Sequence, residues 1–183
     1  MSNTYISEST INQAIEHKLA LSKELRRIEE DSVHSGKSHH NAYDRWACYH
    51  LWLGIPSVIF SALAGTAFFQ DCEVVAGLMS TFAGILTALI TFLKPSERAA
   101  LHKSAGDRYF ALKNDTRLCR EIRLPFTSDQ PNALTNLEEL VQEFLGRRND
   151  LNQLSPAFTR RDFEKTRKGI SEGETTYEVD IGD

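Results

Sequence analysis

The sequence predicts an all-α membrane protein, in which an antiparallel transmembrane hairpin of two helices is flanked by N-terminal and C-terminal cytoplasmic helices. Two uncharged apolar blocks, residues 51–69 and 74–93, predict the membrane-spanning helices. Only residues 70–73 separate the blocks, and so short a connection must turn the second helix straight back along the first. The flanking segments are polar and charged, with apolar residues at helical spacing.

Each apolar block is long enough to cross the hydrocarbon core of a bilayer. Read as helices, the blocks are roughly 28 to 30 Å long, against about 30 Å for the hydrocarbon core. Asp71 and Glu73 are the only charged residues between Leu51 and Leu93. The alternative is a pair of buried core helices in a soluble bundle, although uncharged stretches of this length seldom fit so small a protein.

The basic residues predict the orientation of the hairpin. Lys and Arg gather before the first span and after the second, and none lies in the turn. Because cytoplasmic flanks carry the excess of Lys and Arg, we expect a multi-pass membrane protein with both termini in the cytoplasm. Aromatic residues near the inner end of the first span match an interfacial belt. The residues assigned to topology and lipid contact are Arg45, Trp46, Trp52, Lys94, Arg98 and Lys103.

Each predicted span has a face of small, often hydroxyl-bearing residues opposite a face of bulky ones. Small residues let helices approach closely, and hydroxyls can hydrogen-bond between helices in lipid. The same face could instead line a gated aqueous path, which would need several copies in a ring because one hairpin cannot enclose water. The candidate pore-lining or helix-packing residues are Ser57, Ser61 and Gly65 in the first span, and Ser80, Gly84, Thr87 and Thr91 in the second.

Residues 1–50 form the N-terminal cytoplasmic segment that runs into the first span. Thr10 and Gln13 have capping-box spacing and predict a helix that ends near Asp31. The polar stretch Val33–Asn41 predicts a connection, after which helix resumes near Ala42.

Residues 94–168 form the second cytoplasmic segment. Pro95 can restart a helix that continues to about Ile122. A loop is expected over 125–131, followed by an amphipathic helix that ends at Ser155 and Pro156. The remaining residues, 169–183, carry acids and no base, which predicts a disordered acidic tail.

The sequence offers no recognisable catalytic or metal-binding motif. Gly-rich phosphate loops and HExxH are absent, and His34, His39 and His40 have no matching Cys or carboxylate ligands nearby. We therefore expect no enzyme activity, catalytic residue, metal or cofactor. The net charge of -4 argues against a nucleic-acid binder that works by bulk charge. The spans contain no Asp, Glu, Lys, Arg or His, which argues against a proton relay or a voltage sensor.

The layout resembles the SLATT family, which comprises small two-span bacterial effectors associated with nucleotide-signalling defence genes. The resemblance covers roughly residues 10–168 and rests on this architecture and on the run PSERAALHKSAGDRYFALKNDTRLCREI, which begins at Pro95. It implies a pore-forming or membrane-disrupting effector of antiviral defence, which kills or arrests an infected cell when a nucleotide signal or a partner protein reports phage. The family has no catalytic residues to transfer to this chain.

Together these observations favour a homo-oligomeric membrane effector of an abortive-infection system, whose partners are the lipid bilayer and a nucleotide-signalling or sensor protein encoded nearby. One alternative is a non-catalytic membrane anchor whose cytoplasmic helices recruit a soluble defence enzyme. Another is a structural subunit of a larger membrane complex.

Overall fold

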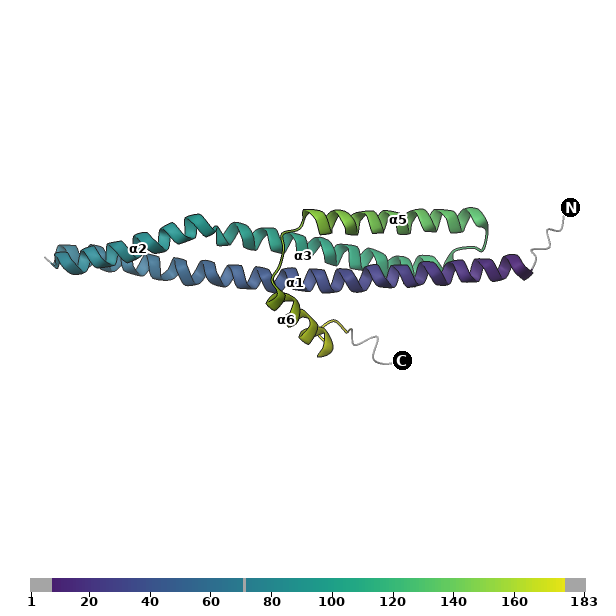
Figure 1. Cartoon of the computed structure of the whole chain (residues 1–183), viewed down its shortest axis with the longest axis horizontal. Coiled ribbons are helices and arrows are strands. Elements are labelled where there is room, and N and C mark those ends of the chain that lie inside the picture. The colour runs from purple at the N-terminus through teal and green to yellow at the C-terminus, as the bar shows by residue number, and fades with distance from the viewer. Residues whose placement is uncertain (1–7, 71, 177–183) are drawn as a thin grey trace. The chain divides into compact units, whose positions relative to one another are not determined.

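The computed structural model describes residues 8–70 and 72–176, and all the elements in this part of the chain are helical. The described residues contain no strand, which confirms the predicted all-α class. Figure 1 labels α1, α2, α3, α5 and α6. In chain order the elements are α1 (Glu8–Phe69), α2 (Glu73–Leu93), α3 (Pro95–Leu118), the π-helical turn η1 (Cys119–Arg123), α4 (Leu124–Phe126), α5 (Pro131–Leu154) and α6 (Arg160–Ser171).

The chain divides into two compact units. We call Met1–His39 with Ala105–Asp183 the bundle unit, and His40–Ser104 the apolar unit. Both α1 and α3 contribute residues to each unit.

The prediction of a connection over Val33–Asn41 is wrong, because α1 is one continuous helix through this stretch. The small polar residues there serve tertiary packing. Gly36 lies against α3 so closely that a Cβ at this position would be 3.1 Å from the Phe110 ring and 3.3 Å from the Tyr109 Cβ. The buried Ser38 hydroxyl donates to the His34 carbonyl at 2.7 Å and is 3.0 Å from the Thr166 hydroxyl of α6. A polar stretch that looks like a loop in sequence is therefore a helix face that touches two other helices.

The core of the bundle unit forms where α1, α3 and α5 meet. The heptad-like apolar positions predicted for the helix after residue 131 point into this core, so the amphipathic pattern of α5 is confirmed. Burying a side chain the size of leucine contributes roughly 1.5 to 3 kcal/mol, so this cluster is the main source of stability in the unit. Its buried members are Leu21, Leu25 and Ile28 of α1, Leu112, Cys119 and Leu124 of the α3–η1–α4 segment, and Leu137, Val141 and Phe144 of α5.

The helix that begins at Pro95 extends further than predicted. It passes from α3 through η1 into α4 and ends at Phe126 instead of near Ile122. The non-helical connection is therefore shorter than the expected loop, and α5 begins with Pro131 in its first turn. Proline suits this position because the first turn of a helix has amide groups without an intrahelical acceptor.

The start of the predicted disordered tail, at residue 169, is also wrong. Helix α6 continues to Ser171, and a capping box joins Thr159 and Asp162 at its N-terminus. Beyond the helix, the Glu174 carboxylate pairs with the Lys37 ammonium of α1. Local capping and this ion pair thus order a segment that its acidic composition alone marked as disordered, whereas residues 177–183 lie outside the described part.

The apolar unit contains the two candidate membrane spans. Within the described residues, two helical stretches are long and apolar enough to cross a membrane, and only 11% of each apolar window is buried in the protein. Core helices of a soluble protein would be mostly buried, so this exposure argues against the soluble-core alternative. Helix α1 ends at Phe69, where the first apolar block ends, and α2 runs from Glu73 to Leu93, whereas no helix boundary marks the predicted start of the first span at residue 51.

We predict that Gly36→Leu destabilises the protein by about 1 to 3 kcal/mol, because the larger side chain would collide with Phe110 and force α1 and α3 apart. The matched control is Gly146→Ala in α5, where an added Cβ meets open space. This control should stabilise the protein by about 0.5 to 1 kcal/mol through helix propensity. Denaturant midpoints of the full-length protein in a mild detergent measure both effects, and a Gly36→Leu protein as stable as wild type would contradict the packing described.

Candidate functional site

Part of the small-residue face holds α1 and α2 together. The buried Ser57 hydroxyl of α1 donates to the Ala83 carbonyl of α2 at 3.3 Å and shares a hydrogen bond of 2.9 Å with the Thr87 hydroxyl. Ala64 and Ala76 are buried in the same unit, and the Phe60 and Phe82 rings lie 5.8 Å apart. At Ser57 the packing interpretation of the small face therefore holds.

The rest of the face borders an open groove of about 600 Å³ on the apolar unit. Five of the seven residues predicted from the helical faces line it: Ser61, Gly65, Ser80, Gly84 and Thr87. Ala64, Ala76 and Ala83 form its floor, and Phe68 and Phe69 lie at one end. The two helices thus bring together residues that sequence reasoning could only assign to separate faces.

The glycines of this groove are not required by the packing of the chain itself. A Cβ added to Gly65 or Gly84 would meet no atom within 4 Å. Glycine in a helix interior is unfavourable by roughly 0.5 to 1 kcal/mol relative to alanine, so it normally serves a close approach or an unusual conformation. Here the backbone is ordinary helix, and the space above both glycines is open. The groove therefore has the surface that close helix packing requires, and no helix among residues 8–70 and 72–176 fills it.

Two of the groove hydroxyls have partners inside the unit. Ser61 donates to the Ser57 carbonyl at 2.8 Å, and Thr87 is bonded to Ser57. Because a hydroxyl oxygen keeps acceptor capacity after donating, these groups can still bind a water or a donor from another helix. Thr91 does not line the groove, since its hydroxyl is exposed and donates to the Thr87 carbonyl of its own helix at 2.9 Å.

A cluster of cations and an indole forms in the apolar unit beside the spans. The guanidinium carbons of Arg45 and Arg98 lie 5.2 and 4.9 Å from the centre of the Trp46 ring. Cation–π attraction of this kind contributes about 0.5 to 1 kcal/mol at exposed sites and more where water is excluded. The pairing of Arg98 with Trp46 joins α3 to α1, and no sequence signal foretold it.

The other residues assigned to topology lie apart from this cluster. Trp52 is 74% exposed on α1. Lys94 adopts a left-handed conformation with φ of 47° between α2 and α3, and its ammonium lies 3.1 Å from the Glu97 carboxylate. Lys103 lies near the end of the unit and has a partner within the protein.

His34 and His39 make aromatic contacts in the bundle unit. His39 stacks on Tyr109 with ring centres 5.5 Å apart and meets the edge of Phe158 at 5.1 Å, whereas His34 lies 6.2 Å from Phe163. Among the described residues, no group of three or more His, Cys, Asp or Glu side chains is arranged to hold a metal ion.

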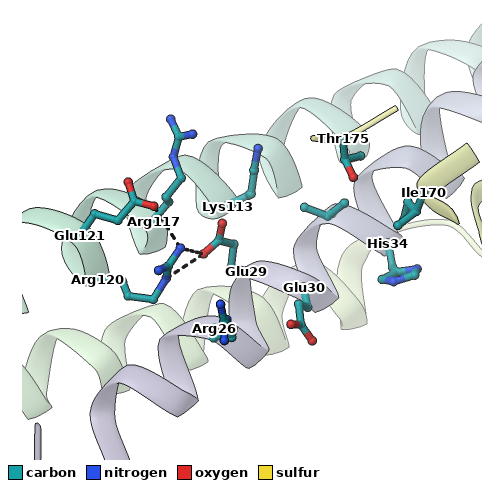
Figure 2. Close-up of a pocket in the computed structure, with 11 residues that line it drawn as sticks. Arg26, Glu29, Glu30, His34, Lys113, Arg117, Arg120, Glu121, Ile170 and Thr175 are labelled. Carbon is teal, nitrogen blue, oxygen red and sulfur yellow. Dashed lines mark hydrogen bonds and ion pairs between the residues drawn. The ribbon is translucent and has the colours of Figure 1, made fainter. Parts of the chain in front are cut away.

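A second pocket, which sequence reasoning did not identify, lies in the bundle unit (Figure 2). Arg120 of η1 reaches across to α1, where its Nε and Nη2 donate to Glu29 Oε2 at 3.1 and 3.0 Å. Arg120 Nη2 also donates to Glu121 at 3.1 Å. Lys113 and Arg117 precede Arg120 at helical spacing, and that spacing is the signal that could have revealed a shared basic face.

The three cysteines differ in environment. Cys48 and Cys72 are exposed, and Cys119 is buried in the core of the bundle unit. Burial raises the pKa of the Cys119 thiol above its ordinary value. Since the thiolate is the reactive form, Cys119 should react slowly with alkylating reagents.

Comparison with known proteins gives no relative: no family model matches the chain, and neither a curated protein nor a solved structure shows significant similarity. The resemblance to the SLATT family therefore stays a prediction.

We predict that the hydrogen bond between Ser57 and Thr87 stabilises the contact of α1 with α2 by about 0.6 kcal/mol, the average for such bonds in membranes. A double-mutant cycle of Ser57→Ala, Thr87→Val and the double variant measures this coupling in detergent. Ser61→Ala combined with Thr87→Val is the control cycle, because the Ser61 hydroxyl bonds within its own helix. Strictly additive effects in the first cycle would contradict the interaction.

Proposed function

We propose that this chain is a homo-oligomeric effector of a bacterial inner membrane, which assembles through its small-residue groove and makes the membrane permeable when a signal reaches the bundle unit. In this proposal α1 from about residue 51 and α2 cross the membrane as an antiparallel hairpin, with both termini in the cytoplasm. The chain acts through assembly and has no enzymatic step.

Membrane insertion is supported by the large apolar surface that the chain leaves uncovered. Contiguous exposed apolar patches on soluble monomers rarely exceed a few hundred Å². On both helices of the apolar unit, bulky residues are exposed along the whole predicted spans. These residues are Leu51, Trp52, Ile55, Val58, Ile59, Leu63, Phe68, Phe69, Val74, Val75, Leu78, Phe82, Ile85, Leu89 and Phe92.

The proposed orientation is supported by the cluster of Arg45, Trp46 and Arg98. These three residues come from the two helices that flank the spans. Amphipathic rings and cations prefer the membrane–water interface, and Lys and Arg are enriched on the cytoplasmic side. The absence of any base between Leu51 and Leu93 fits an outer turn.

The single observation that carries the oligomeric proposal is the groove with glycines that the chain itself does not need. Gly65 and Gly84 border open space, with hydroxyls of Ser61, Ser80 and Thr87 beside them. In lipid, helices associate mainly through close packing and hydrogen bonds, and glycine next to hydroxyl residues provides both. A second hairpin seated there would leave the groove closed, and repetition around an axis would form a ring.

A leak, in preference to selective transport, is supported by the chemistry of the spans. No charged residue lies within them, so nothing supplies a proton relay or an ion-selective charge ring. Hydroxyls can wet a path once neighbouring hairpins move apart. A signal needs to shift the balance between closed and open assemblies by only a few kcal/mol.

The biological role follows from the resemblance to the SLATT family. Membrane permeabilisation would kill or arrest a phage-infected cell, and the trigger would be a nucleotide signal or a sensor protein encoded nearby. This role makes the quiescent state essential, because an effector that leaks without infection would kill its host.

We predict that Gly84→Leu lowers the association constant of the chain with itself about tenfold or more, because the larger side chain would occupy the groove. A steric penalty of roughly 1.4 kcal/mol suffices for a tenfold change. Gly77→Leu is the matched control, because Gly77 lies on the same helix, also borders open space and does not line the groove. Cross-linking in membranes measures assembly. A potential-sensitive dye measures depolarisation during phage challenge of cells that carry the neighbouring genes.

The proposal requires Gly84→Leu to lose both oligomer and depolarisation while Gly77→Leu keeps them. If the two variants assemble and depolarise the membrane equally, the groove is not the surface through which the chain assembles. If cells that express the wild-type protein keep their membrane potential under phage challenge, the proposed leak is contradicted.

The competing function is a membrane anchor that recruits a soluble defence enzyme, and one observation favours it. The bundle unit exposes apolar pairs at helical spacing, Ile15 with Leu19 on α1 and Leu118 with Ile122 on the α3–η1 segment. Such residues suit a protein partner. Replacing residues 51–93 with an unrelated hairpin separates the two functions, because an anchor would still protect cells and a pore would not.

A further inference from the structure

We propose that the bundle unit binds a small organic phosphate in the pocket of Figure 2, a site that does not depend on the proposed membrane function. The pocket has a volume of about 250 Å³ and lies among α1, the α3–η1 segment and the end of α6. Its lining residues that matter for the proposal are Arg26, Glu29, His34, Lys113, Arg117 and Arg120.

The charge of the pocket favours an anion. Four bases line it together with the carboxylates of Glu29, Glu30 and Glu121, so the lining keeps a net positive charge. Lys113, Arg117 and Arg120 come from one helical face. Arg120 is held by Glu29 and Glu121 at 3.0 to 3.1 Å, which fixes its guanidinium toward α1. Arg26 lines the pocket from α1. Guanidinium groups match the oxygens of a phosphate in paired hydrogen bonds, so this arrangement suits a phosphate better than an isolated carboxylate.

Lys113 is a buried cation in the wall of this pocket. The residue is only 8% exposed, although it carries an ammonium group. Burying a cation is unfavourable unless anionic groups or hydrogen bonds compensate it. Lys113 already has a partner within the protein, and a phosphate in the pocket would be a further anionic partner.

Two further features of the pocket wall point to a ligand. The His34 Nδ1 atom is buried and has no hydrogen-bond partner, and His34 lines the pocket. A phosphate oxygen could accept a hydrogen bond from a protonated Nδ1. In addition, Arg120 and Glu121 belong to the π-helical turn η1, and single π turns inside α-helices occur frequently at functional sites.

The organic part of the ligand is indicated by an adjoining cavity of about 480 Å³. It shares Val33, Lys113 and Thr175 with the basic pocket, so one molecule can occupy both. Phe110 and Asn114 line the second cavity, and they offer an aromatic face and an amide. This combination favours a phosphate ester that carries a flat or apolar group over inorganic phosphate.

The test uses the full-length protein in uncharged maltoside micelles and titrates phenyl phosphate or inorganic phosphate by calorimetry. We expect wild type to bind phenyl phosphate more tightly than inorganic phosphate. Arg26→Gln and Arg117→Gln should each weaken phenyl phosphate binding about tenfold, the loss expected for a charged hydrogen bond. Arg108→Gln is the matched control, because Arg108 is exposed on α3 and does not line the pocket.

Arg26 is exposed, so its replacement tests the site without a risk to folding. Absence of phenyl phosphate binding to wild type would overturn the proposal. Equal affinities of the Arg26→Gln, Arg117→Gln and Arg108→Gln proteins would overturn it as well, because they would mean non-specific charge attraction.

A final arm identifies the source of the phosphate. Addition of phosphatidylglycerol to the micelles displaces phenyl phosphate if the natural ligand is a lipid headgroup, and leaves it bound if the ligand is soluble. Either result supports the phosphate site, and neither requires a membrane potential, so failure of this test is distinct from failure of the leak.

Discussion

The structure depends on one constraint, which is the apolar surface of the two candidate spans that the described residues leave uncovered. Phe69 is 86% exposed and Phe92 is 84% exposed. Exposure of apolar area to water is unfavourable by roughly 25 cal/mol per Å², whereas a bilayer removes that penalty. In lipid the backbone must satisfy its own hydrogen bonds. Two continuous helices do so except at Pro56 of α1, which has no amide proton to donate. The short turn and the lack of charge in the spans are consistent with the same environment.

The small residues of the candidate spans fall into two groups in the structure: some make contacts within the chain, and others border open space. Ser57 and Ala83 join α1 to α2, so they stabilise the single chain. Gly65 and Gly84 do nothing comparable, because the space beside them is open. A face that one helical wheel shows as continuous is therefore divided between contacts within the chain and a surface suited to another helix.

The sequence predicts the parts of this fold that depend on composition and on the spacing of apolar residues along a helix. The limits of the spans, Phe69 and Leu93, follow from where charge begins, and the core positions of α5 follow from its apolar spacing. Tertiary contacts could not be predicted in the same way. Polarity around Gly36 suggested a loop, because only the structure shows Phe110 packed against that glycine. The Arg120–Glu29 pair likewise joins helices far apart in sequence, and no local pattern links them.

The most direct test of the account is the position of Cys72 relative to the membrane. In a Cys48→Ser protein, Cys72 is the one exposed thiol, since Cys119 is buried and burial raises its pKa. The account predicts that a membrane-impermeant maleimide labels Cys72 in intact spheroplasts, because the turn between the spans faces outward. Labelling that appears only after the membrane is permeabilised would contradict the proposed double crossing with an outer turn.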